Sequence, residues 1–520
     1  MQIQIGRIGN VKRNIYYGFA QVAITQLFPF VTRTIIIYSF GVEFLGINSL
    51  FSSILNVLSL MELGFGTAVV FSMYKPVAEN DIDQLCAYLA YYKKIYRSVG
   101  LSIMVSGLTI IPFIRYMVNS TILPSELNLV ICYLIFLSDS VISYILYGYY
   151  SAIPIAFQRR DILSRIDLCA MGLKCIVQIM ALSLANSFYG YLFVIPGTTI
   201  VKNLMTALVV RYKYPDIICR GKLNDQQIIE LKKRVRGILI SKVTGISRNG
   251  IDSICISSFI GLAILGIYNN YLYIMSGIIA FSSMLRSAMI ASVGNSIVVE
   301  NREKNYDDMR IIDGIYMTIS GWATVCMFCL YQPFIFVWIG SDMLLEYPMV
   351  IGICLYFYIL KNGDIQWLYQ EGAGLWYENR FIMLGEALLN CFLNILLCKN
   401  MGVLGIILAT VISVFITNVI LCPRLLFKMY FGISRLKKYW IDHMLYTCTM
   451  VLSAVACCFL CSCIFPLSML VGRIVVNSVL CLVGRLLLCT LFTFMIVWII
   501  WHRSERYKRA KAWIKRVMMA

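Results

Sequence analysis

Residues 44–74 read FLGINSLFSSILNVLSLMELGFGTAVVFSMY, and Glu62 is the one charged side chain among them. An α-helix needs about 20 predominantly apolar residues to cross the roughly 30 Å hydrocarbon core of a bilayer. This stretch exceeds that length and lies between two charged residues, Glu43 and Lys75. It therefore predicts a helix that crosses a membrane.

Stretches of the same kind follow one another along nearly all 520 residues. Hydrophobic residues make up 60% of the chain and charged residues 14%, whereas a soluble domain carries about 25% charged residues. The sequence therefore predicts an all-α polytopic membrane protein with about fourteen transmembrane helices. Twelve or thirteen also fit, since a gap as short as 41–43 can belong to a re-entrant segment. The predicted spans are 14–40, 44–74, 98–118, 127–150, 166–186, 191–210, 238–261, 265–290, 314–338, 349–370, 381–398, 402–423, 445–465 and 474–501.

Lysine and arginine residues crowd every second gap between these spans, while the other gaps hold only Arg115, Lys399 and Arg473. Cytoplasmic loops carry such an excess of positive charge. Both termini are therefore predicted to lie on the cytoplasmic side of a bacterial cytoplasmic membrane. The net charge of +19 is then interpreted as contact with anionic lipid rather than nucleic acid. The basic tail, with Arg503, Arg506, Lys508, Arg509, Lys511, Lys515 and Arg516, is interpreted as a membrane-surface anchor.

A short motif recurs near the start of the second and the eighth predicted spans. It reads SFGVEFLGINSLF at residues 39–51 and SFIGLAILGIYNNYLY at residues 258–273, an offset of 219 to 220 residues. Six spans separate the copies, so both halves would enter the membrane in the same direction, in a pseudo-two-fold arrangement. We expect an N-lobe at 1–210, a basic cytoplasmic linker at 211–237, a C-lobe at 238–426, two added helices at 427–502 and a basic cytoplasmic tail at 503–520.

Basic side chains also lie inside the predicted spans. A charge at mid-membrane costs roughly 2.5 to 3.5 kcal/mol on insertion scales, so it usually faces a polar cavity or a partner. The candidates for substrate binding are Arg33, Lys202, Lys242, Arg248 and Arg286. Lys174 and Arg485 receive structural interpretations, the first as a residue that extends toward the membrane surface and the second as a helix-packing contact.

Ion pairing is the competing interpretation of these charges. Arg248 and Asp252 are four residues apart, and Lys361 and Asp364 are three apart, so each pair can meet on one face of a helix. Both roles stay open for Arg248 and Lys202, whereas Arg33 has no acidic residue within a turn. Basic residues exceed acidic ones in the predicted lobes, which favours an anionic cargo. The candidates for coupling transport to H⁺ or Na⁺ are Glu62, Asp139, Asp252 and Asp364.

The sequence offers little support for an enzyme, a metal site or a cofactor. It has two histidines, no glycine-rich phosphate loop and only short predicted exterior gaps. Most of the 19 cysteines lie within predicted spans, which argues against a disulfide framework. We interpret the group Cys457, Cys458, Cys461 and Cys463 as small apolar packing, because no histidine or carboxylate accompanies it.

Residues 29–83, PFVTRTIIIYSFGVEFLGINSLFSSILNVLSLMELGFGTAVVFSMYKPVAENDID, resemble the N-terminal region of bacterial Wzx-type polysaccharide flippases. The resemblance continues in KKIYRSVG at 93–100 and GIYNNY at 266–271. These flippases belong to the multidrug/oligosaccharidyl-lipid/polysaccharide exporter superfamily. The resemblance implies a V-shaped core of twelve helices with two added helices, which carries an undecaprenyl-pyrophosphate-linked oligosaccharide outward for surface polysaccharide synthesis. It also implies that Arg33, Arg248 and Arg286 contact the pyrophosphate.

Several alternatives remain open at this stage. A multidrug exporter on the same scaffold would favour an acidic cavity, and a membrane-embedded glycan polymerase or ligase would need an exterior catalytic loop. A non-transporting scaffold would not need charge inside the membrane. The expected partners are lipid-linked oligosaccharide, anionic lipids, a polysaccharide polymerase and glycosyltransferases, and the expected oligomeric state is a monomer.

Overall fold

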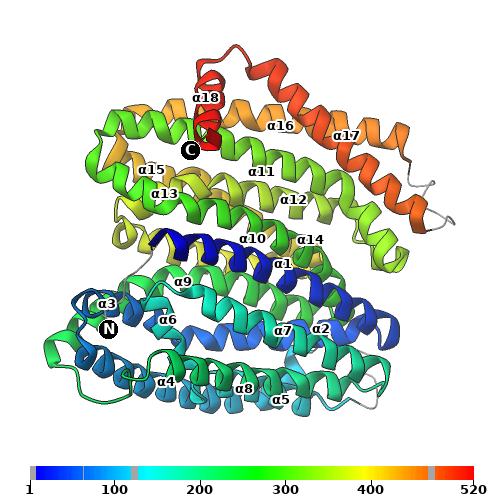
Figure 1. Cartoon of the computed structure of the whole chain (residues 1–520). Coiled ribbons are helices and arrows are strands. Elements are labelled where there is room, and N and C mark those ends of the chain that lie inside the picture. The colour runs from blue at the N-terminus through cyan, green and yellow to red at the C-terminus, as the bar shows by residue number, and fades with distance from the viewer. Residues whose placement is uncertain (1–6, 63, 119–126, 467–474, 520) are drawn as a thin grey trace. The chain divides into compact units, whose positions relative to one another are not determined.

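The structure is a computed structural model that describes residues 7–62, 64–118, 127–466 and 475–519 (Figure 1). Some side chains within helices, including those of residues 236–249, lie outside this description. The described residues form helices joined by turns and short loops, with no strand among them. The all-α prediction is therefore confirmed.

The chain divides into two compact units, Met1–Gly266 and Ile267–Ala520. In the first unit α1 packs on α7, α7 packs on α8, and α8 packs on α5. This unit holds α1 (Arg7–Ser39), α2 (Val42–Leu58), α3 (Phe65–Glu79), α4 (Ile82–Ile110), α5 (Leu129–Ile145), α6 (Ala152–Ala156), α7 (Arg160–Ser183), α8 (Phe188–Lys213) and α9 (Asp225–Phe259). The predicted lobe boundaries stay a prediction.

In the second unit α11 is the central helix, because it packs on α12, α16 and α17. Helix α10 (Leu262–Val299) starts in the first unit and continues into the second. The other helices are α11 (Arg302–Ile339), α12 (Tyr347–Asn362), α13 (Asp364–Gly372), α14 (Trp376–Phe415), α15 (Cys422–Leu426), α16 (Leu436–Ile464), α17 (Val475–Trp501) and α18 (Glu505–Met519).

The repeated motif forms the same helix break twice. The amide of Gly41 donates to Ile36 at 3.1 Å, and the amide of Gly261 donates to Ile256 at 2.9 Å. Both glycines have positive φ, 105° and 140°, a region that favours glycine because other residues are strained there. These pairs share an offset of 220 residues, so the break needs none of the one-residue slippage that the sequence match suggested.

The two copies also contact each other within the first unit. A Cβ atom on Gly46 would lie 2.1 Å from the carbonyl oxygen of Leu262, and one on Gly266 would lie 2.4 Å from that of Val42. The two contacts are related by the same offset of 220 residues. The glycines therefore let the start of α2 and the start of α10 approach backbone to backbone.

Among the described residues, eight helices are long and apolar enough to cross a membrane, and a pair bent by 57°, Leu129–Ile145 with Gly148–Ala156, would make a ninth. The number differs from the expected fourteen partly because Tyr377–Phe431 is counted once. That segment contains two predicted spans and has non-helical angles at Gly402 (φ 58°, ψ −135°).

Other predicted spans are broken helices. The stretch 44–74 is wrong as a single helix, since α2 ends at Leu58 and α3 begins at Phe65. Between them lie a 3₁₀ turn at Ser59–Glu62 and Gly64 with φ 78°. The predicted span 349–370 is likewise divided into α12 and α13. By contrast, the predicted linker ends in α9, which starts at an Asn224–Gln227 capping box and continues to Phe259.

Candidate functional site

The first unit gathers polar side chains from α1, α2, α7 and α8 around Tyr191. Asn48 donates to the Tyr191 hydroxyl at 3.3 Å, and Gln178 donates to the Tyr191 carbonyl at 3.4 Å. Arg33 is half-buried and interacts electrostatically with the same hydroxyl. Pro29, within α1, lies one turn before Arg33. The structure thus places Arg33 in a polar environment inside a predicted span, and its role in substrate binding stays a prediction.

A second polar group lies where α7 meets α8 and α1. Lys202 forms an ion pair with Asp167 at 2.8 Å, and Gln21 donates to the same carboxylate at 2.7 Å. The Lys202 side chain nevertheless remains 47% exposed. Sequence reasoning did not name Asp167 as a counter-charge, although the residue lies at the start of a predicted span.

Asp139 and Lys174 extend this region of the first unit. Thr199 donates to Asp139 at 2.5 Å. Lys174 is attracted electrostatically to Asp139 and repelled by Lys202, so the three charges share one environment. Lys174 is half-buried among them, and the interpretation that it simply extends toward the membrane surface is incomplete.

Glu62 lies at the break between α2 and α3, facing tyrosine hydroxyls. Tyr96 donates to one carboxylate oxygen at 3.3 Å, and Tyr144 donates to the other at 3.1 Å. A Cβ atom on Gly66 would lie 2.7 Å from the Tyr92 hydroxyl, so a glycine there leaves room for these rings. The break therefore presents a carboxylate in a polar cage, which suits binding of a proton or a small cation.

The second unit has its own charged group on α10, α11, α12 and α13. Lys361 pairs with Asp364 at 2.7 Å, as the three-residue spacing predicted, and Tyr316 also donates to Asp364. Lys361 is 3% exposed, so its charge is used inside the fold. Arg286 lies 3.7 Å from Glu371 and keeps 31% of its side chain exposed.

The remaining predicted residues fall into two groups. The side chains of Lys242 and Arg248 lie outside the described residues, so the proposed Arg248–Asp252 pair stays a prediction, and Asp252 itself is buried. Arg485 donates to the backbone carbonyls of Phe465 and Cys329 at 3.2 and 3.1 Å. Its interpretation as a helix-packing contact is therefore confirmed.

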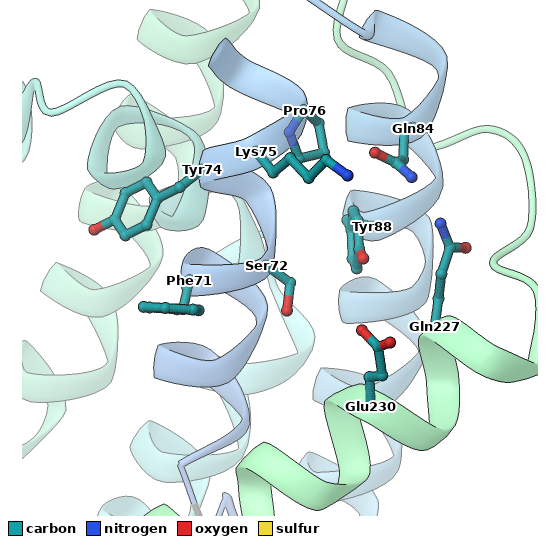
Figure 2. Close-up of a pocket in the computed structure, with 9 residues that line it drawn as sticks. All are labelled: Phe71, Ser72, Tyr74, Lys75, Pro76, Gln84, Tyr88, Gln227 and Glu230. Carbon is teal, nitrogen blue, oxygen red and sulfur yellow. The ribbon is translucent and has the colours of Figure 1, made fainter. Parts of the chain in front are cut away.

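A polar pocket of about 410 Å³ opens between α3, α4 and the start of α9. Figure 2 shows Lys75 and Gln84 on one side and Gln227 and Glu230 on the other, while Tyr74 points away from them. Amide, hydroxyl, ammonium and carboxylate groups thus face one small space, together with the Tyr88 ring. The basic loops around these helices place the pocket on the side that is predicted to be cytoplasmic. Sequence reasoning missed it because its lining comes from three separate helices.

An apolar groove of about 460 Å³ lies on α10 and α11 in the second unit, and Leu486 of α17 contributes to its wall. Phe281, Trp322 and Phe334 supply aromatic surface, and almost no polar atom faces the groove. Such a lining suits a hydrocarbon chain.

No protein-family model matches the sequence, and no curated protein matches it. Solved structures do match. One is described as the lipid II flippase MurJ in an inward closed conformation, with 14% identity, a TM-score of 0.65, and coverage of 94% of this chain and 99% of that chain. A second is an inward-facing multidrug resistance MATE family transporter of the MOP superfamily, with 13% identity, a TM-score of 0.60, and coverage of 79% and 95%.

A third similar structure is an outward-facing transporter of that MATE family, with 15% identity, a TM-score of 0.57, and coverage of 82% of this chain and 96% of that chain. The chain therefore has the fold of MOP superfamily transporters and is a polytopic membrane protein. These descriptions name transporters and flippases rather than enzymes, in agreement with the prediction that the chain is not an enzyme.

Proposed function

We propose that this protein is a flippase that moves an undecaprenyl-pyrophosphate-linked oligosaccharide across the bacterial cytoplasmic membrane by alternating access. The observation that carries the proposal is the pair of accessible cations inside a transporter fold. Lys202 and Arg286 each face a carboxylate, yet their side chains remain 47% and 31% exposed. Charge at this depth normally marks a substrate or ion pathway.

The geometry of Arg286 supports binding of a phosphate group. Its single 3.7 Å approach to Glu371 is longer than a charge-assisted hydrogen bond of about 2.7–2.9 Å. The guanidinium therefore keeps donors for another anion, and its planar fork matches phosphate oxygens at two points. We propose that Arg286, Lys202 and Arg33, together with Arg248 and Lys242, contact the pyrophosphate during transport.

Two further features support a cargo with a lipid part and a sugar part. The apolar groove on α10 and α11 could hold an isoprenoid segment, since burying each CH₂ group contributes about 0.8 kcal/mol. The polar pocket beside Lys75, Gln84 and Gln227 could bind sugar hydroxyls before entry. The amides and the carboxylate there can act as donors and acceptors.

Coupling to an ion gradient would give transport a direction. Glu62 in its tyrosine cage is our first candidate for binding H⁺ or Na⁺, and Asp139, Asp252 and Asp364 are the others. Moving one elementary charge through 100 mV changes the free energy by about 2.3 kcal/mol. No resident cofactor is needed for this cycle.

A multidrug exporter is the second candidate, because two of the similar structures are multidrug MATE transporters. A cationic drug would bind best where carboxylates outnumber bases. Here every carboxylate in the two ion pairs at Lys202 and Lys361 already has a basic partner. A glycan polymerase or ligase would in addition need an acid–base site for sugar transfer. We therefore favour the lipid-linked oligosaccharide.

The proposal is tested by reconstituting the purified protein in liposomes that contain fluorescently labelled lipid-linked oligosaccharide. We expect the label to become accessible to an external quencher faster than in protein-free liposomes. A labelled organic cation serves as the competing cargo. Transport of the cation without movement of the glycolipid would contradict the flippase and favour the exporter.

A further inference from the structure

Three cysteine side chains from three different helices meet inside the second unit. They are Cys329 on α11, Cys461 on α16 and Cys489 on α17, and their sulfur atoms all lie within 4.8 Å of one another. The Cys461 and Cys489 sulfurs are 3.8 Å apart. All three are buried, with exposed fractions of 5%, 2% and 0%. Of the four clustered cysteines in the sequence, only Cys461 belongs to this group.

A buried cation accompanies the three thiols. Arg485 precedes Cys489 by one helical turn and is 6% exposed. It donates to the carbonyl of Cys329 itself at 3.1 Å and to that of Phe465 at 3.2 Å. Among the described residues, no carboxylate lies within ion-pair distance of Arg485. An intramembrane arginine normally has an anionic partner, since an uncompensated buried charge is costly.

We propose that Cys329, Cys461 and Cys489 bind one thiophilic divalent cation, of which Zn²⁺ is the representative. Zinc binds thiolates at about 2.3 Å in a tetrahedral arrangement, which places neighbouring sulfurs roughly 3.8 Å apart. The Cys461–Cys489 separation already has this value, and a small movement of Cys329 would complete three ligands. A water molecule can occupy the fourth position.

Charge balance explains why the site contains an arginine. Each thiol loses its proton to solvent when it binds the metal, so three thiolates and one divalent ion form a group with a single negative charge. The guanidinium of Arg485 neutralises that charge. The bound metal would join α11 to α16 and α17, so we assign it a structural role.

A disulfide is the competing fate of these sulfurs. It requires a sulfur–sulfur distance of about 2.05 Å, whereas Cys461 and Cys489 are 3.8 Å apart. It would also leave the third thiol unused and Arg485 without an anion. The metal accounts for all four residues.

The test uses the full-length protein, purified in detergent and washed with a chelator. Elemental analysis after incubation with Zn²⁺ should find about one zinc per chain. X-ray absorption at the zinc edge should show three sulfur neighbours at about 2.3 Å. With Cd²⁺ as a second probe, a sulfur-to-cadmium charge-transfer band should appear in the ultraviolet spectrum. The triple variant C329A/C461A/C489A should lose both signals.

The matched control removes three buried thiols elsewhere, in C175A/C354A/C422A, and should keep both signals. If the triple variant fails to fold, Arg485→Gln provides a milder change. We expect it to weaken Cd²⁺ binding about tenfold or more, as loss of an outer-shell partner usually does. Absence of retained zinc in the unmodified protein, equal zinc in the triple variant, or a Cys461–Cys489 disulfide in mass spectra would each overturn the proposal.

Discussion

At the scale of single residues, Arg286 and Glu371 form an ion pair loose enough for a competing anion to replace the carboxylate. We predict that Arg286→Ala slows glycolipid translocation in liposomes about tenfold or more, because a hydrogen bond to a charged group contributes roughly 1.5–3 kcal/mol. Glu371→Gln should preserve or increase the rate, since it removes the competitor. Arg115→Ala, at an exposed position, is the control for loss of an arginine. Equal rates for Arg286→Ala and Arg115→Ala would contradict a headgroup role.

The tyrosine cage around Glu62 leads to a second prediction at this scale. Glu62→Gln keeps the shape and the hydrogen-bonding capacity of the side chain but cannot take up a proton or balance a cation. We expect translocation by this variant to become insensitive to imposed proton and sodium gradients. Glu79→Gln, on the exposed end of α3, should behave like the unmodified protein. Retained gradient dependence in Glu62→Gln would assign coupling to one of the aspartates instead.

The candidate site could be predicted from the sequence only where the partners are local. Lys361 and Asp364 are three residues apart, so helical geometry was enough to pair them. Asp167 belongs to α7 and its partner Lys202 to α8, and no periodicity in one helix reveals a contact between two helices. The same limit explains why Cys461 was grouped with its neighbours in sequence rather than with Cys329 and Cys489.

At the scale of elements, the two glycines of the repeat make a prediction about packing. Gly46→Ala would place a methyl group 2.1 Å from the backbone oxygen of Leu262, and a backbone atom cannot rotate away as a side chain can. We expect a loss of about 1–3 kcal/mol in stability, the usual cost of overpacking. Gly266→Ala should behave similarly because its contact with Val42 is equivalent.

Gly172→Ala is the control for these glycine variants, since nothing lies within 4 Å of a Cβ atom there. It should be neutral or slightly stabilising, because alanine favours a helix more than glycine does. Thermal unfolding in detergent, followed by tryptophan fluorescence, measures the difference. A melting temperature for Gly46→Ala equal to that of Gly172→Ala would show that α2 and α10 do not cross at this point.

Helix α18 corrects one interpretation of the basic tail. Arg506 was grouped with lipid-binding charges, but it is 9% exposed and contacts Asp313 at 3.1 Å and Asp442 at 3.3 Å. Its charge is therefore used inside the second unit, where His443 also contacts Asp313 at 3.0 Å. The composition of the tail could not reveal this, since an anchoring arginine and a buried one look alike in sequence.

We predict that Arg506→Ala releases α18 from the second unit, because it leaves two acidic residues with one basic partner fewer. Breaking a buried ion pair typically costs about 3–5 kcal/mol. Limited proteolysis should cleave the C-terminal segment of this variant faster than that of the unmodified protein. Lys508→Ala, which removes an exposed charge from the same helix, should leave the cleavage rate unchanged. Equal rates for the two variants would mean that α18 is held by other contacts.

At the scale of the whole molecule, apolar stretches and their length predicted the helical membrane fold, and the repeat predicted the equivalent breaks at Gly41 and Gly261. The breaks after Leu58 and Asn362 were missed, because short polar turns hardly change the hydropathy of a long stretch. Both lie beside residues with functional proposals, Glu62 and Asp364. Discontinuous helices in transporters often carry binding groups at such points.

The orientation of the chain in the membrane is the last prediction, and it depends on charge alone. Basic residues crowd the loop between α8 and α9, whereas the loop between α11 and α12 contains acidic residues and no basic one. Positive loops remain in the cytoplasm, so the two loops should lie on opposite sides of the membrane. A green fluorescent protein reporter fused after Gly221 should fluoresce, while one fused after Gly340 and exported unfolded should not. Alkaline phosphatase at the same points should give the reverse result, because it is active only outside the cytoplasm. Fluorescence at both positions would contradict the orientation and, with it, the outward direction proposed for the cargo.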